Sequence, residues 1–146
     1  MQNLHVCLAS FVIGCGGGGQ SPATDAASGV PDAEVALGCA TGNAEKINFS
    51  QQQSCANDGS VEFCIPDGDL ELRDMMRAIS TSITCAPGGG RAECNRVPGL
   101  LLCTYPTAFP EQCSTQHGAM TDEVWSDMCA ISAFPEITAI VATFFE

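Results

Sequence analysis

Cysteine content constrains the fold of this 146-residue chain more than any other feature. Two of its ten cysteines, Cys7 and Cys15, lie near the N-terminus, and the other eight lie between positions 39 and 129. An even number without any Cys-x-x-Cys spacing favours disulfides over zinc or iron–sulfur ligation, with free thiols as the remaining alternative. Spacing alone leaves the pairing open. The predicted disulfide cysteines are Cys39, Cys55, Cys64, Cys85, Cys94, Cys103, Cys113 and Cys129.

Four disulfides indicate an oxidising compartment outside the cytoplasm. Each native disulfide contributes about 2–4 kcal/mol by restricting the unfolded chain. A chain of this size can build a core without them. We therefore expect them to serve durability outside the cytoplasm.

The first fifteen residues resemble the signal of bacterial lipoproteins. Val6 to Ile13 is apolar except for one serine and is shorter than the roughly 20 residues that a membrane span needs. Gly14 and Cys15 follow, and Val12 stands where a lipobox has its aliphatic residue. Met1 to His5 holds no lysine or arginine, unlike most export signals, so we expect the true start codon to lie upstream.

The resemblance implies a processed and lipidated protein. Residues 1–14 are then the signal peptide, and Cys15 carries a diacylglyceryl group and a palmitate-like acyl chain on its new amino terminus, which together anchor stably in a membrane. Gly16 is not the aspartate that retains many lipoproteins at the inner membrane. The resemblance therefore implies the bacterial envelope, at the outer membrane rather than the inner. The alternative is a cytosolic chain whose apolar start is a core strand or helix.

The remaining sequence divides into a linker, residues 15–38, and one domain, residues 39–146. Gly16 to Gly38 is rich in glycine, serine, alanine and proline and has no aromatic residue, so it cannot bury enough apolar surface to fold. The net charge of −12, with five lysines and arginines, argues against nucleic-acid binding. We expect contact with the membrane through the lipid alone, and an envelope protein or polymer as partner.

Within the domain, hydrophobic periodicity predicts four strands and two helices. The strands are expected at residues 61–65, 81–85, 100–105 and 137–145, and the helices at 70–79 and 122–132. The order strand, helix, strand, strand, helix, strand predicts an α+β fold of the ferredoxin-like split βαβ type. An irregular disulfide-stapled α+β domain is the alternative. In either layout we expect Cys64 to meet Cys129, and Cys85 to meet Cys94.

Signatures of catalysis are missing from the sequence. It contains no Gly-x-Ser-x-Gly elbow, no phosphate-binding Gly-x-x-x-x-Gly-Lys-Ser/Thr loop and no His-Glu-x-x-His helix, so no cofactor is expected. Gly88 to Arg91 is a candidate anion-binding loop, with a mobile loop as the alternative. A run of acids fits a helix N-terminus better than a calcium loop, whose required glycine and glutamate are missing. These acids are Asp67, Asp69, Glu71 and Asp74.

Two further residues are considered singly. His117 is the only histidine left after processing, and its neighbours indicate a solvated loop rather than a catalytic pair. Trp125 is the only tryptophan and shares a helical face with Met128 and Cys129, which predicts a core position.

Three function classes remain open. The first is a non-enzymatic lipoprotein domain that binds an envelope component or contributes to surface structure. The second is a displayed inhibitor or toxin-like module, which predicts a rigid exposed loop at residues 87–96 or 105–113. The third is a small carboxylate-dependent enzyme, which predicts a cleft holding two acids with perturbed pKa values.

Overall fold

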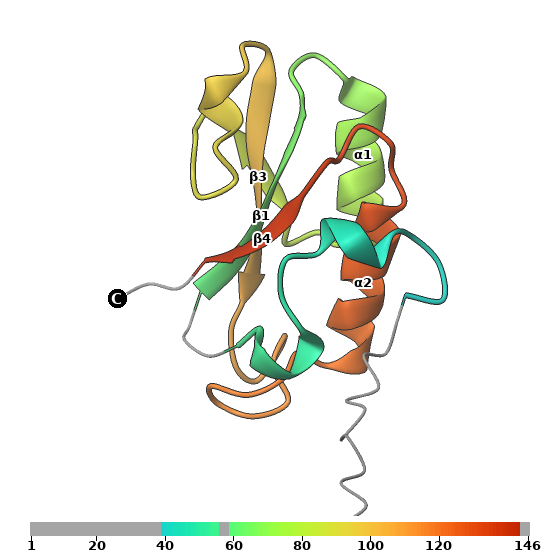
Figure 1. The fold of residues 1–146 in the computed structure, drawn as a ribbon, viewed down its shortest axis with the longest axis vertical. Helices are drawn as coiled ribbons and strands as arrows, with labels where there is room; N and C mark the ends of the chain where they lie inside the picture. The colour runs from blue at the N-terminus through green and yellow to red at the C-terminus, as the bar shows by residue number, and fades with distance from the viewer. Residues whose placement is uncertain (1–38, 56–58, 144–146) are drawn as a thin grey trace, which may run out of the picture. The chain divides into compact units, whose positions relative to one another are not determined.

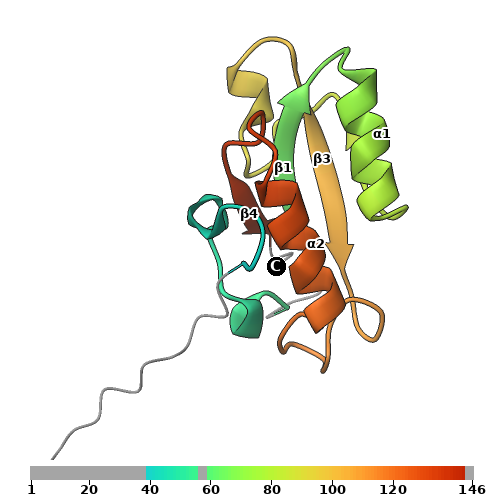
Figure 2. The same cartoon turned by 90° about the vertical axis from the view of Figure 1, so that its right-hand side faces the viewer.

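The computed structural model describes residues 39–55 and 59–143, which form a four-stranded antiparallel sheet with two helices on one face (Figures 1 and 2). The strands are β1 (Gly59–Pro66), β2 (Thr84–Ala86), β3 (Leu100–Thr107) and β4 (Ile140–Thr143), in the order β2-β3-β1-β4. Helix α1 (Leu70–Ile79) connects β1 to β2, and α2 (Asp122–Ser132) connects β3 to β4. This is the split βαβ order, so the predicted α+β fold is confirmed.

The core lies between the sheet and the two helices. Alternate residues of β1, namely Val61, Phe63 and Ile65, are fully buried. They stand opposite inward-facing residues of β3, which are Tyr105, Cys103 and Leu101. Because side chains alternate along a strand, the residues between them point to the other face of the sheet.

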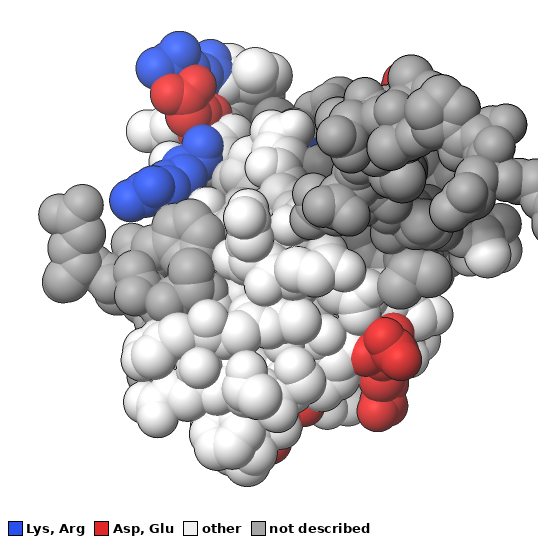
Figure 3. All heavy atoms as spheres, turned by 60° about the horizontal axis from the view of Figure 1, so that its bottom comes forward, with Lys and Arg blue, Asp and Glu red and all other residues white. Residues whose placement is uncertain are grey.

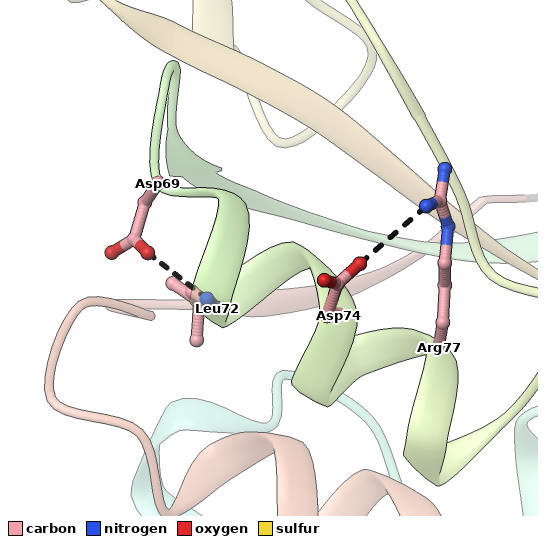
Figure 4. A network of polar contacts seen from close by, with 4 residues as sticks. All are labelled: Asp69, Leu72, Asp74 and Arg77. Carbon is pink, nitrogen blue, oxygen red and sulfur yellow. Dashed lines mark hydrogen bonds and ion pairs between the residues drawn. The ribbon is translucent and has the colours of Figure 1, made fainter.

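Helix α1 begins and ends where the sequence predicts. The Asp69 carboxylate accepts a hydrogen bond of 2.9 Å from the backbone N–H of Leu72, which caps the first turn (Figure 4). Leu72 and Met76 are buried and Ile79 is half-buried. Met75 is 38% exposed, so the buried stripe is narrower than its apolar residues suggest.

Helix α2 is capped at its start and joined to the N-terminal part of the domain at its end. The Thr121 hydroxyl accepts from the N–H of Val124 at 3.3 Å. At the other end, the buried Ser132 hydroxyl donates to the carbonyl of Cys129 and accepts from the N–H of Asn43. The first described residues therefore pack against the last turn of α2.

Two strands differ in extent from their predicted ranges. The second strand is β2, at 84–86, because Thr81 and Ser82 form a turn in which Ile83 N–H bonds to the Ser80 carbonyl. The last is β4, at 140–143 within the described residues, because Ile137 belongs to a turn closed by its N–H on the Phe134 carbonyl. Ile137 still lies fully inside the core.

Three short 3₁₀ helices complete the described structure. η1 (Ala44–Lys46) and η2 (Gln51–Gln53) belong to the N-terminal part, where the N–H of Asn48 bonds to the Ile140 carbonyl of β4. η3 (Cys94–Arg96) lies in the loop between β2 and β3, residues 87–99. This loop packs on the sheet face opposite the helices, where it contacts Glu62 and Cys64 of β1.

Candidate functional site

All eight predicted domain cysteines form disulfides. The pairs are Cys39–Cys129, Cys55–Cys113, Cys64–Cys94 and Cys85–Cys103. Four disulfides indicate a protein of an extracytoplasmic compartment. The predicted lipid-attachment residue, Cys15, and the linker that follows it lie outside the described residues.

Both specific pairings expected from the sequence are wrong. Cys64 cannot reach Cys129, because it alternates with the buried Phe63 and so points to the face opposite the helices. It joins Cys94 of the 87–99 loop instead. Cys85 stands directly opposite Cys103 in the β2–β3 register and bonds to it across the two strands.

The glycine-rich loop binds an anion, but that anion is a side chain of the same domain. Glu62 of β1 is 9% exposed, and its Oε2 accepts from the backbone N–H of Arg91 at 2.5 Å and of Ala92 at 3.2 Å. Gly90 has a positive φ of 55°, and a Cβ there would overlap the Glu62 carboxylate. The loop is therefore held over the sheet by Glu62 and by the Cys64–Cys94 disulfide.

The acidic run at the start of α1 has a structural role. Asp69 caps the helix, and Asp74 lies 3.6 Å from the Arg77 guanidinium in an exposed ion pair (Figure 4). In residues 39–55 and 59–143, no three side chains of histidine, cysteine, aspartate or glutamate are grouped as metal ligands.

His117 and Trp125 occupy different environments. His117 is exposed, with a positive φ of 59°, in the loop before α2. Trp125 is half-buried, and its ring meets that of Phe49 edge to face at 6.1 Å. It lines a small hollow of about 290 Å³ beside the Cys39–Cys129 disulfide.

A second hollow, with converging polar groups, is a groove of about 370 Å³. We call it the helix-end groove, because it lies between the C-terminal end of α1 and the first two turns of α2. Strand β3 and the loop that follows it supply the rest of its wall. Its lining residues are Arg77, Ala78, Ile79, Ser80, Thr81, Tyr105, Glu111, Gln112, Glu123, Val124 and Asp127.

A hydrogen-bonded pair lies at the base of the helix-end groove. Tyr105 of β3 is 3% exposed, and its hydroxyl donates to Asp127 Oδ2 of α2 at 2.8 Å. Burial raises the pKa of Tyr105 to about 12, and the hydrogen bond to Asp127 adds to the rise. Burial also raises the pKa of the Asp127 carboxyl, and the hydrogen bond from Tyr105 opposes that rise.

Charge is distributed unevenly over the described surface. Figure 3 shows a face on which uncharged side chains predominate, although the chain carries a net charge of −12. The helix-end groove, in contrast, gathers the carboxylates of Glu111, Glu123 and Asp127, against one cationic side chain, Arg77. Such a wall attracts cations and repels anions.

Neither Tyr105 nor Asp127 is predicted as a site residue from the sequence. The alternation of β3 points Tyr105 into the core, and a buried tyrosine hydroxyl needs a hydrogen-bond partner. The need for this partner predicts a polar group close to the inner face of the sheet. It does not identify the partner, because Asp127 lies 22 residues further along the chain.

Comparison of the chain with protein-family models, curated proteins and solved structures found no match. Among the described residues, neither helix has the length and apolar character to cross a membrane.

Proposed function

We propose that this protein is a lipid-anchored envelope protein whose domain binds a partner, without catalysis, in the helix-end groove. The lipid anchor rests on the resemblance of the first fifteen residues to lipoprotein signals. The extracytoplasmic location rests on the four disulfides.

The observation that carries the binding function is the way disulfides hold the groove wall. Cys55–Cys113 fixes the loop that supplies Glu111 and Gln112. Cys85–Cys103 ties β2 to β3 two residues before Tyr105. A site fixed before its ligand arrives loses less conformational entropy on binding, which favours a binding role.

A site-specific crosslink in intact cells tests this function. A photoreactive residue is placed at Ala78, in the groove wall, or at Ala44, an exposed position of η1 outside it. We expect a discrete adduct from position 78 and none from position 44. Equal adducts from both positions, or none from either, would contradict a role for the groove.

The anchor has a separate test. Cells fed radiolabelled palmitate should label the protein and retain it in the membrane fraction. We expect Cys15→Ser to abolish the label and release the protein, whereas Cys7→Ser should change neither. Unchanged labelling of the Cys15 variant would contradict the anchor.

A second candidate, the displayed inhibitor, is favoured by the loop between β2 and β3. Glu62 and the Cys64–Cys94 disulfide fix this loop, and it presents the exposed side chains of Arg96 and Val97. Incubation of the purified protein with a panel of trypsin-like proteases tests this candidate. Stoichiometric inhibition that is lost in Arg96→Ala would support it, and unaffected proteases would rule it out for this enzyme class.

A further inference from the structure

We infer that the helix-end groove receives a lysine side chain of a protein partner, its ammonium bound at the Tyr105–Asp127 pair. The inference rests on the proposed binding function and adds the chemistry of the ligand.

The charge of the groove selects a cationic group. Three carboxylates face it, and the one cation of its wall, Arg77, is exposed and already lies 3.6 Å from Asp74. An anionic ligand would have to approach against this excess of negative charge.

The base of the groove offers acceptors that an ammonium can use. Within the described residues, the one hydrogen bond to the Asp127 carboxylate comes from Tyr105 and occupies Oδ2. A carboxylate accepts several hydrogen bonds, so Oδ1 can take another. The Tyr105 hydroxyl donates a hydrogen bond to Asp127, and its oxygen can still accept one. An ammonium with three donors matches these oxygens and the Glu123 carboxylate one turn earlier on α2.

The exposed wall of the groove is mainly polar, but a smaller apolar part of it can contact an aliphatic stem. Ala78 and Ile79 at the end of α1 face a hollow whose other wall includes Val124 of α2. A lysine side chain has this combination of an apolar stem and a charged head. Sugar-binding sites commonly offer an exposed aromatic ring for stacking, and the ring that lines this groove, Tyr105, is 3% exposed.

Tyr105 gives a site-specific signal, because it is the only tyrosine of the chain. The full chain with its disulfides formed is labelled at tyrosine, and the ring resonances are followed by NMR during titration. The first probe is the blocked tripeptide acetyl-Gly-Lys-Gly-amide. A norleucine tripeptide keeps the stem without the charge, and glucosamine supplies an ammonium on a sugar.

Two variants test the residues that bind the ammonium, each with a matched control. Asp127→Asn removes the charge at the base, and Asp67→Asn makes the same change at an exposed residue outside the groove. Glu123→Gln and the exposed Glu136→Gln form the second pair. Because Asp127 would be a charged acceptor for the ammonium, we expect Asp127→Asn to weaken lysine binding at least about tenfold, equivalent to about 1.4 kcal/mol. Both control variants should bind as the native protein does.

The outcomes separate this inference from the proposed function. The inference is supported if the Tyr105 resonances shift saturably with the lysine probe and the norleucine tripeptide binds with at least about tenfold lower affinity. Equal binding of norleucine, or tighter binding of glucosamine, overturns the lysine assignment. If no probe binds but the crosslink at position 78 still forms, the inference fails and the binding function stands. Loss of the crosslink as well overturns both.

Discussion

Gly42 sits where a side chain has no room. Its φ is +99°, and a Cβ there would overlap the Cys129 carbonyl oxygen and press on the Ser132 hydroxyl. The positive φ alone disfavours other residues, and the contact with α2 adds to it. Gly42 therefore lets the first described residues lie close to the last turn of α2.

We predict that Gly42→Ala lowers the free energy of unfolding by at least about 2 kcal/mol, from backbone strain and steric overlap together. Gly68→Ala is the matched control, because Gly68 also has a positive φ, +89°, but nothing within 4 Å of the added Cβ. It should cost about 1 kcal/mol from the backbone alone. Denaturant unfolding with the disulfides intact measures both, and equal losses would contradict the predicted clash.

Tyr105 links the groove to a measurable pH dependence. We predict that its phenolate absorbance titrates with a midpoint of about 12, against about 10 in the unfolded chain. Between these values the folded state holds a proton that the unfolded state has lost. The free energy of unfolding should therefore fall as the pH rises through this window.

Asp127→Asn should lower the Tyr105 midpoint, because it removes a neighbouring negative charge. The midpoint should stay above about 10, since burial, the largest cause of the rise, remains. Asp67→Asn should leave it unchanged. A native midpoint near that of free tyrosine would show that Tyr105 is neither buried nor paired with Asp127 as described.

At the scale of elements, the loop between β2 and β3 depends on one buried carboxylate. We predict that Glu62→Ala destabilises the protein by about 2 kcal/mol, because the N–H groups of Arg91 and Ala92 lose a charged acceptor. Their amide hydrogen exchange should accelerate, although the Cys64–Cys94 disulfide still holds the loop. Glu136→Ala, at an exposed position in the turn before β4, should alter neither exchange nor stability. Unchanged exchange in the Glu62 variant would mean that the disulfide alone fixes the loop.

The elements themselves could be predicted because their signals are local. Asp69 caps α1 and Thr121 caps α2, and each stands next to an apolar periodicity that its helix then follows. The strand order follows from the split βαβ order of elements, because among the paired strands only β2 and β3 are consecutive in the chain. The disulfide pairs required long-range information, namely the strand register that sets Cys85 opposite Cys103. The alternation around Phe63 did contain evidence against the pair Cys64–Cys129.

The helix-end groove could not be predicted for the same reason. Tyr105, Glu111 and Asp127 come from a strand, a loop and a helix, and only the packed sheet and helices bring them together. No short motif marks such a site. The sequence lacks the motifs of signature-dependent enzymes, and it does not locate a binding site, which depends on the tertiary structure.

At the scale of the whole molecule, the disulfides differ in the chain length that they enclose. Cys39–Cys129 spans 90 residues and Cys85–Cys103 spans 18. In the chain-entropy account, a longer loop loses more freedom in the unfolded state, and the difference here is about 1.4 kcal/mol.

We therefore predict that replacing Cys39 and Cys129 together by serine lowers the free energy of unfolding more than replacing Cys85 and Cys103. Chemical denaturation of the two double variants measures this, with retained secondary structure as the check on folding. A larger loss in the Cys85/Cys103 variant would show that local packing, rather than chain entropy, governs these disulfides.

The Cys39–Cys129 disulfide also determines how the domain responds to pulling. On the proposed topology, a partner held at Asp127 pulls against an anchor at Cys15. The tension then passes along α2 from Asp127 to Cys129, two residues later, and through the disulfide to Cys39. The sheet lies outside this path, so the force does not break the hydrogen bonds between its strands. Force applied at Asp127 would then reach residue 39 without crossing the sheet, so the groove would keep its shape.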